Sequence, residues 1–237
     1  MNLIIMRHSD CAGLKENVIN GWLDLGLTSE GKEKAAKEAM KLKNMTIDKA
    51  FSSYLSRAYD TANIVLSSLG QSNIKVEQDI RLNERHYGAF QGITKEMAYT
   101  SPSYNTLSIS SDRLDNRLIP IDDERYNKQL TEYSKKLGIP KDKLSLPKSE
   151  SIIDVETRVL SFLKEKVFIP ENENKTILVV GHANTVKLMT KYIEALSYEE
   201  TSKLRFATCG MNIYSIEYKD FKINILNIQR INDEYVY

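Results

Sequence analysis

The chain has few of the residues that build disulfide scaffolds, membrane spans or metal clusters. Its 237 residues include two cysteines, Cys11 and Cys209, which are far apart and form no C-x-x-C pair. This number and spacing of cysteines is typical of a reducing compartment and predicts no metal cluster. No apolar run approaches the roughly 18 residues of a membrane span, and the first residues lack the basic and apolar regions of a signal peptide. We therefore expect a cytoplasmic protein that does not span a membrane.

The chain also lacks an excess of charge of either sign. Its 33 basic and 32 acidic residues nearly cancel. The composition therefore shows no excess of positive charge of the kind that binds nucleic acid or an anionic membrane. Any site for an anion must therefore be local.

Short apolar runs alternate with amphipathic segments along the chain. Residues 3–6 and 176–180 are typical of buried parallel strands, residues 49–53 form a shorter candidate, and residues 212–218 and 222–228 favour terminal strands. Apolar residues at helical spacing predict helices over about 28–43, from Ser56 to Gly70, after Ser151 and around residues 186–196, with Ser56 and Ser151 as N-caps. This order predicts one α/β domain over residues 1–237, with a mainly parallel sheet in a three-layer α/β/α arrangement.

One stretch interrupts this alternation. Residues from about 100 to 146 are rich in Ser, Asn, Asp, Pro and charge. This composition is typical of loops. We expect an irregular insertion here.

Two of the three histidines follow the two clearest strands directly. His8 comes after residues 3–6 and Arg7, and His182 comes after residues 176–180 and Gly181. Ligands of open α/β sheets bind beyond the carboxyl ends of the strands, so the two imidazoles are predicted to face one another across a site. The alternative is that both are ordinary loop histidines with satisfied hydrogen bonds.

Two further features indicate a phosphate site. Arg57 lies in the first turn of a predicted helix, where a cation opposes the helix dipole but where an anion could be bound by backbone N–H groups and a guanidinium together. The run Arg81 to Gly88 is too polar for a core, and its Glu84 could pass a proton to a leaving oxygen. The alternatives are a solvated arginine and a surface ion pair.

Six short motifs occur in one order over nearly the whole chain: Arg7-His8, Gly21-Trp22-Leu23-Asp24, Ser56-Arg57-Ala58, Arg81 to Gly88 continuing to Lys95, Glu150-Ser151, and Gly181-His182-Ala183-Asn184. In this set and order the chain resembles the cofactor-dependent phosphoglycerate mutases of the histidine phosphatase superfamily. The run Arg81 to Gly88 with Lys95 resembles the mutase branch in particular. The resemblance implies a phosphoglycerate mutase-like α/β/α fold.

The resemblance also implies a role for each matching residue. By position, His8 is the phosphorylated nucleophile and Glu84 is the proton donor and acceptor. The other positions form a phosphate pocket of Arg7, Arg57 and His182 and a substrate shell of Asn20, Gly21, Arg85, Tyr87, Lys95, Ala183 and Asn184. The resemblance further implies 2,3-bisphosphoglycerate as the phosphoryl primer, no metal, a small phosphorylated metabolite as substrate, and a homodimer or homotetramer.

Several positions depart from the mutase pattern close to the substrate. The family's glycine, glutamate and serine after the histidine are Ser9, Asp10 and Cys11 here, and its Trp-Asn pair is Gly13-Leu14. A phosphate-contacting asparagine is therefore lost. The hydroxyl of Ser9 or the side chain of Asn17 could replace it.

Two departures concern substrate choice and water. The family's arginine pair that binds the substrate carboxylate has no clean counterpart after Lys95, although Arg113 or Arg117 could serve. Few residues follow the last predicted strand, so we expect a short C-terminal tail over the site. Less exclusion of water favours hydrolysis of a phosphohistidine.

Three hypotheses remain open at this point. The leading one is a mutase that interconverts 3-phosphoglycerate and 2-phosphoglycerate through phosphorylated His8. The second is a histidine-type phosphatase that hydrolyses a small phosphorylated metabolite, supported by Leu14, the missing arginine pair and the short tail. The third is an inactive scaffold or regulatory binding protein that retains the fold.

Overall fold

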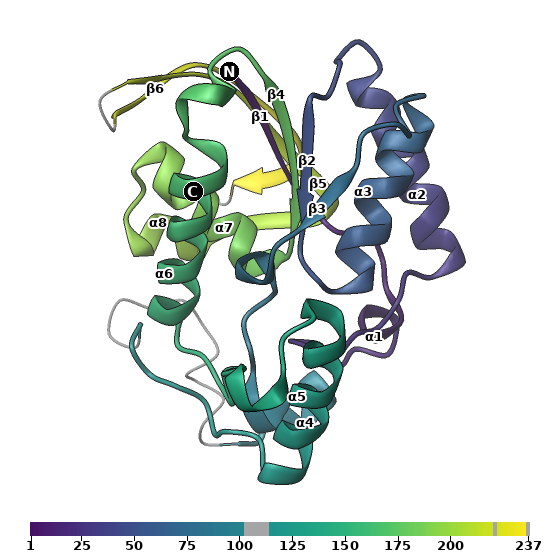
Figure 1. Cartoon of the computed structure of the whole chain (residues 1–237), viewed down its shortest axis with the longest axis vertical. Helices are drawn as coiled ribbons and strands as arrows, with labels where there is room; N and C mark the ends of the chain where they lie inside the picture. The colour runs from purple at the N-terminus through teal and green to yellow at the C-terminus, as the bar shows by residue number, and fades with distance from the viewer. Residues whose placement is uncertain (102–113, 220–221, 236–237) are drawn as a thin grey trace.

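The chain is built around a mixed sheet (Figure 1). In a computed structural model, which describes residues 1–101, 114–219 and 222–235, the sheet has six strands in the order β3-β2-β4-β1-β5-β6. The strands are β1 Asn2–Arg7, β2 Lys49–Ser52, β3 Val76–Gln78, β4 Thr176–Gly181, β5 Leu204–Lys219 and β6 Lys222–Tyr235. Strands β1 to β4 pair in parallel, whereas β5 pairs antiparallel with β1 and β6. The prediction of a mainly parallel sheet is confirmed.

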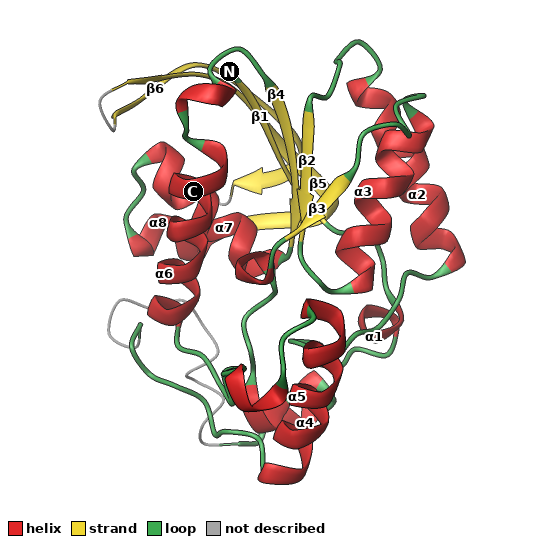
Figure 2. Ribbon diagram, in the orientation of Figure 1, coloured by secondary structure: helices red, strands yellow, loops and turns green. Residues whose placement is uncertain are grey.

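Helices cover both faces of this sheet (Figure 2). Helices α2 Ser29–Ala39 and α3 Ser56–Ser68 cover one face, and α6 Ile152–Phe162, α7 Ala183–Glu194 and α8 Tyr198–Lys203 cover the other. Successive residues of a strand point to opposite faces. Ile4 and Met6 of β1 accordingly pack in the core under α2 and α3, while Leu3 and Ile5 pack under α6 and α7. The predicted three-layer α/β/α architecture is confirmed.

Three helices lie beyond the carboxyl ends of the parallel strands, at the bottom of Figure 1: α1 Ala12–Lys15, α4 Lys95–Tyr99 and α5 Asp123–Leu137. Helix α5 corrects the expectation of an irregular segment over about 100–146. Its Tyr126, Leu130, Tyr133 and Leu137 recur at helical spacing and pack in one cluster with Trp22 and Leu146. The polar composition of the segment concealed this stripe.

The helix starts agree with the sequence in one case and differ in another. Ser151 caps α6 in a capping box with Asp154, as predicted. Ser56 is the first residue of α3 and Leu55 is its N-cap, so the predicted cap is wrong. The carboxylate of Asp24 accepts the backbone N–H of Ser56 at 2.7 Å and thereby replaces a local cap.

The terminal strands are longer than predicted. The expected strands 212–218 and 222–228 are the second half of β5 and the first half of β6, which form an antiparallel hairpin. Register shifts occur between Phe206 and Met211 and again after Ser215. These irregularities break the alternation of buried and exposed residues, which is the signal that marks a strand in a sequence.

Candidate active site

The carboxyl ends of β1 and β4 bring His8 and His182 together. The two strands are hydrogen-bonded neighbours with Arg7 opposite Gly181, and the backbone N–H of His8 donates to the carbonyl of Gly181 at 3.0 Å. The next residue of each strand is therefore a histidine at the same edge. The ring centroids of His8 and His182 lie 5.0 Å apart.

His8 presents a defined nitrogen to this edge. Its Nδ1 lies 2.6 Å from the carbonyl oxygen of Ser9, and because a carbonyl only accepts, Nδ1 carries the proton. The lone pair is therefore on Nε2. Burial, together with the charges of Arg57 and Arg7, lowers the pKa of His8 well below its ordinary value. The imidazole is neutral at physiological pH, as an attacking nitrogen must be.

His182 shares this environment. Its Nε2 lies 2.7 Å from the hydroxyl of Ser53, which follows β2. Burial comes first among the causes that lower the pKa of His182 well below its ordinary value, followed by the charges of Arg57 and His8. Two neutral rings thus stand side by side in a positive field.

The positive field comes from Arg7 and Arg57. Backbone carbonyls hold both side chains: Arg57 donates to Gly21 and Leu23 at 2.8 Å each, and Arg7 donates to Phe206 at 2.6 Å. The Nε atoms of both guanidinium groups are buried and have no partner in the described part of the chain. Such unpaired donors are costly in a protein interior. They suit an anion that accepts from both.

Glu84 lies beside this cluster and is 7% exposed. One carboxylate oxygen accepts the backbone N–H of Arg85 at 2.8 Å and the side-chain amide of Asn184 at 3.0 Å. The same amide donates to the hydroxyl of Tyr87 at 2.6 Å. Burial raises the pKa of Tyr87, with the charge of Glu84 as the next cause. The loop 81–88 and helix α7 thus meet at one carboxylate.

The other residues predicted to surround a substrate belong to different elements of the structure and differ in burial. Asn20 donates to the sulfur of Cys11 at 3.3 Å, Gly21 adopts a positive φ of 50°, and Ala183 is the first residue of α7. Lys95 is the first residue of α4 and is exposed. Arg85 is fully buried, and its Nε donates to the carbonyl of Glu150 at 2.8 Å. The structure therefore ties Arg85 into the protein interior.

Of the residues proposed to replace missing family positions, Ser9, Asn17 and Arg117 lie within the described part of the chain. The hydroxyl of Ser9, one of the two suggested replacements, donates to the carbonyl of Gly31 at 2.7 Å, so it joins the end of β1 to α2 and its proton is not directed at a phosphate. Asn17 is exposed. Arg117 is exposed and paired with Asp154 at 2.8 Å. Arg113 lies outside the described residues.

Sequence reasoning missed two residues that touch this cluster. Ser53 follows β2 at the carboxyl edge of the sheet, a position that alone could have marked it. Arg158 on α6 donates to backbone carbonyls of the loop that carries Glu84. No local signal distinguishes Arg158 from a solvated helix arginine, because its partners are far away in sequence.

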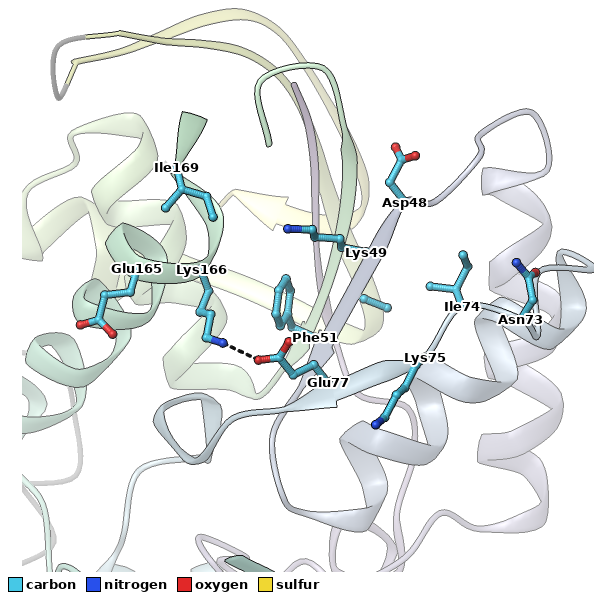
Figure 3. A pocket seen from close by; sticks show the side chains of 11 residues that line it. Asp48, Lys49, Phe51, Asn73, Ile74, Lys75, Glu77, Glu165, Lys166 and Ile169 are labelled. Atoms are coloured by element: carbon cyan, nitrogen blue, oxygen red, sulfur yellow. Dashed lines mark hydrogen bonds and ion pairs between the residues drawn. The ribbon is translucent and has the colours of Figure 1, made fainter. Parts of the chain in front are cut away.

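The described chain has a hollow away from this cluster. A hollow at the amino ends of β2 and β3 is lined by charged side chains such as Lys49 and Lys75, with Lys166 paired to Glu77 at 2.6 Å (Figure 3). Within residues 1–101, 114–219 and 222–235, no group of three metal-ligating side chains occurs. No helix over the same ranges is long and apolar enough to cross a membrane.

Comparison with known families gives one match over most of the chain. The profile of the histidine phosphatase superfamily (branch 1) matches residues 3–117 and 120–229. The chain is 35% identical over 227 residues to a 2,3-bisphosphoglycerate-dependent phosphoglycerate mutase of Borreliella burgdorferi (strain ZS7), covering 91% of this chain and 86% of that protein.

Solved structures of both mutases and phosphatases share the fold. A phosphoglycerate mutase from Bacillus anthracis str. Sterne superposes with a TM-score of 0.68 at 20% identity, covering 98% of this chain and 92% of the other. A phosphoserine phosphatase from Entamoeba histolytica, in complex with 3-phosphoglyceric acid, gives a TM-score of 0.67 at 20% identity, covering 96% and 95%. At these identities the likeness establishes the fold alone.

Proposed function

The chain belongs to the histidine phosphatase superfamily, and we propose that it is a 2,3-bisphosphoglycerate-dependent phosphoglycerate mutase that interconverts 3-phosphoglycerate and 2-phosphoglycerate. The observation that carries the proposal is the cluster at the sheet edge. Neutral His8 lies in the field of Arg7 and Arg57, whose Nε donors are unpaired, and the charge of Glu84 acts on both arginines. Relatives at 35% identity that carry the mutase name support this choice of reaction.

The chemistry follows from these groups. Nε2 of His8 attacks phosphorus in line, a nitrogen–phosphorus bond forms, and the bond from phosphorus to the ester oxygen breaks. The electron pair leaves with that oxygen, to which Glu84 gives a proton. Arg7 and Arg57 hold the remaining phosphoryl oxygens and stabilise their charge. The phosphohistidine then transfers its group to a second hydroxyl, whose proton Glu84 takes back, so that one transfer is divided into two.

The implied primer fits these residues. The two buried Nε donors, from Arg7 and Arg57, suit the oxygens of one phosphate. These arginines would hold 2,3-bisphosphoglycerate, which supplies the phosphoryl group when bound. Asn184 and Tyr87, joined at 2.6 Å, lie beside Glu84 and would contact the glycerate part. We propose further that the enzyme is cytoplasmic and assembles as a homodimer or homotetramer.

A second candidate is a histidine-type phosphatase acting on a small phosphorylated metabolite. The observation that favours it is Arg117, which is exposed and committed to Asp154. Asp154 already accepts from Nε and from one terminal nitrogen of Arg117, so binding a substrate carboxylate would compete with this pair. Hydrolysis would use the same phosphohistidine, with water as the acceptor.

A paired assay separates the two reactions. Purified protein is given 3-phosphoglycerate with and without 2,3-bisphosphoglycerate, and the formation of 2-phosphoglycerate and of inorganic phosphate is followed in parallel. Isomerisation that is stimulated by bisphosphoglycerate supports the mutase. Release of inorganic phosphate from a panel of phosphoesters without isomerisation establishes the phosphatase. Absence of activity in both assays indicates a scaffold.

A further inference from the structure

Arg158 of α6 binds the backbone of the loop that carries Glu84. One guanidinium nitrogen donates to the carbonyls of Arg81 and Asn83, each at 2.6 Å. The other terminal nitrogen donates to the carbonyl of Glu84 at 3.0 Å. Three carbonyls within four residues of chain thus converge on one side chain.

A buried carboxylate orients this guanidinium. Glu150 accepts from Nε of Arg158 at 2.8 Å and from a terminal nitrogen at 2.9 Å. The Arg158 and Glu150 side chains are 16% and 6% exposed. Glu150 also accepts the backbone N–H of His86 at 2.8 Å. The pair therefore holds the loop by hydrogen bonds to residues before and after Glu84.

The backbone of Glu84 is fixed from two directions. Its carbonyl accepts from Arg158 and also from the indole N–H of Trp22, at 2.6 Å. Its carboxylate is bound at the same time by the backbone of Arg85 and by Asn184. A shift of the backbone would therefore displace the carboxylate from its partners.

We propose that Arg158 is a positioning residue that holds Glu84 where it can protonate the leaving oxygen. This inference rests on the proton-transfer role given to Glu84 in the proposed function. Arg158 acts only through the backbone and through Glu150. Lysine cannot substitute, because an ammonium lacks the planar fork that reaches the Glu150 carboxylate and three carbonyls at once.

The choice of leaving group isolates this role. Transfer from an alkyl phosphate such as glycerol phosphate needs a proton on the departing oxygen, whereas p-nitrophenolate leaves without one. Phosphorylation of His8 is therefore measured in single turnovers with both esters, for the wild type, Arg158→Lys and Arg158→Gln. We expect a loss of about 10- to 100-fold with glycerol phosphate, as part of the contribution of a general acid, and less than about threefold with p-nitrophenyl phosphate.

Three further variants calibrate the result. Glu84→Gln should show the same selective loss, and adding Arg158→Lys to it should cost little more, because both changes remove one function. Arg230→Lys is the matched control. Arg230 also pairs with a glutamate whose side chain is only 9% exposed, Glu194 at 2.6 Å, but joins β6 to α7. It should leave the ratio of the two rates unchanged.

Several outcomes would overturn the proposal. Equal losses with both esters would place the effect of Arg158 on the phosphate pocket or on folding, and urea unfolding of each variant would separate these. Unchanged rates with glycerol phosphate would remove Arg158 from positioning altogether. If the wild type formed no phosphohistidine from these esters or from 2,3-bisphosphoglycerate, the proposed function itself would fail, which is a distinct result.

Discussion

The rings of His8 and His182 lie 5.0 Å apart between centroids and are tilted by 56°. Parallel pairing of β1 with β4 places the two histidines at this distance, and burial beside Arg57 keeps both rings neutral by lowering the pKa of each. A neutral pair beside two cations can accept a dianionic group. The same pairing makes the folded protein sensitive to acid.

Acidification below about pH 6.5 should destabilise the protein. The pKa values of His8, His86 and His182 are all lowered in the folded state, first by burial. The unfolded chain, with histidines of pKa about 6.5, therefore binds protons that the folded chain does not. The free energy of unfolding should be constant above that pH and fall below it by up to about 1.4 kcal/mol per pH unit for each histidine.

Urea unfolding between about pH 7.5 and pH 5.5 measures this dependence. A His8→Gln variant should show a shallower slope than the wild type, because one of the three groups has been removed. A stability that does not change over this interval would show that the three rings are not held neutral.

Replacement of Arg57 should weaken the binding of inorganic phosphate. An Arg57→Ala variant loses a charge-assisted donor, which is worth about 1.5 to 3 kcal/mol, or roughly 10- to 150-fold in Kd. It also leaves the carbonyls of Gly21 and Leu23 without this donor, so Arg57→Lys is examined beside it. Arg125→Ala, which removes an exposed pair with Asp122, serves as the control. Equal phosphate affinity in all four proteins would contradict the phosphate pocket.

The Glu84→Gln variant should lose activity without losing its fold. The amide oxygen can still accept from Asn184, as the carboxylate does at 3.0 Å, but the side chain no longer exchanges a proton. We expect kcat to fall by about 10²- to 10⁴-fold, with an unchanged midpoint of thermal unfolding. A twofold change in kcat would exclude Glu84 from acid–base catalysis.

Loss of the Tyr133 hydroxyl should destabilise the region next to Glu84. The side-chain amide of buried Asn83 donates to this hydroxyl at 2.7 Å, so Tyr133→Phe leaves a buried donor unpaired at a cost of about 1 to 3 kcal/mol. Tyr126→Phe is the control, because the Tyr126 hydroxyl makes only a 3.5 Å contact with the backbone of Leu146. Urea unfolding should show the larger loss for Tyr133→Phe, and equal losses would refute the assignment.

The elements that carry the site could be predicted where local signals and topology agree. Strands β1 and β4 are built on the apolar runs 3–6 and 177–180, and parallel strands end at the same edge. The approach of His8 to His182 therefore follows from the sequence. Helix α5 was hidden because its apolar stripe, from Tyr126 to Leu137, lies in a segment of polar composition.

Contacts between distant segments could not be predicted in this way. Ser9 stands next to His8 in sequence, yet its hydroxyl turns to the carbonyl of Gly31 because α2 packs against it. Arg158 binds backbone carbonyls of a distant loop. Every residue has such a carbonyl, so the sequence does not show which of them Arg158 binds. Such roles depend on how the helices pack around the sheet.

The central claim is that His8 carries the phosphoryl group. Incubation with ³²P-labelled 2,3-bisphosphoglycerate, rapid quenching in alkali and peptide mapping test it most directly. We expect an acid-labile label on the peptide that contains His8, and no label in the His8→Ala variant. A label on any other residue, or undiminished labelling and turnover in His8→Ala, would contradict the account.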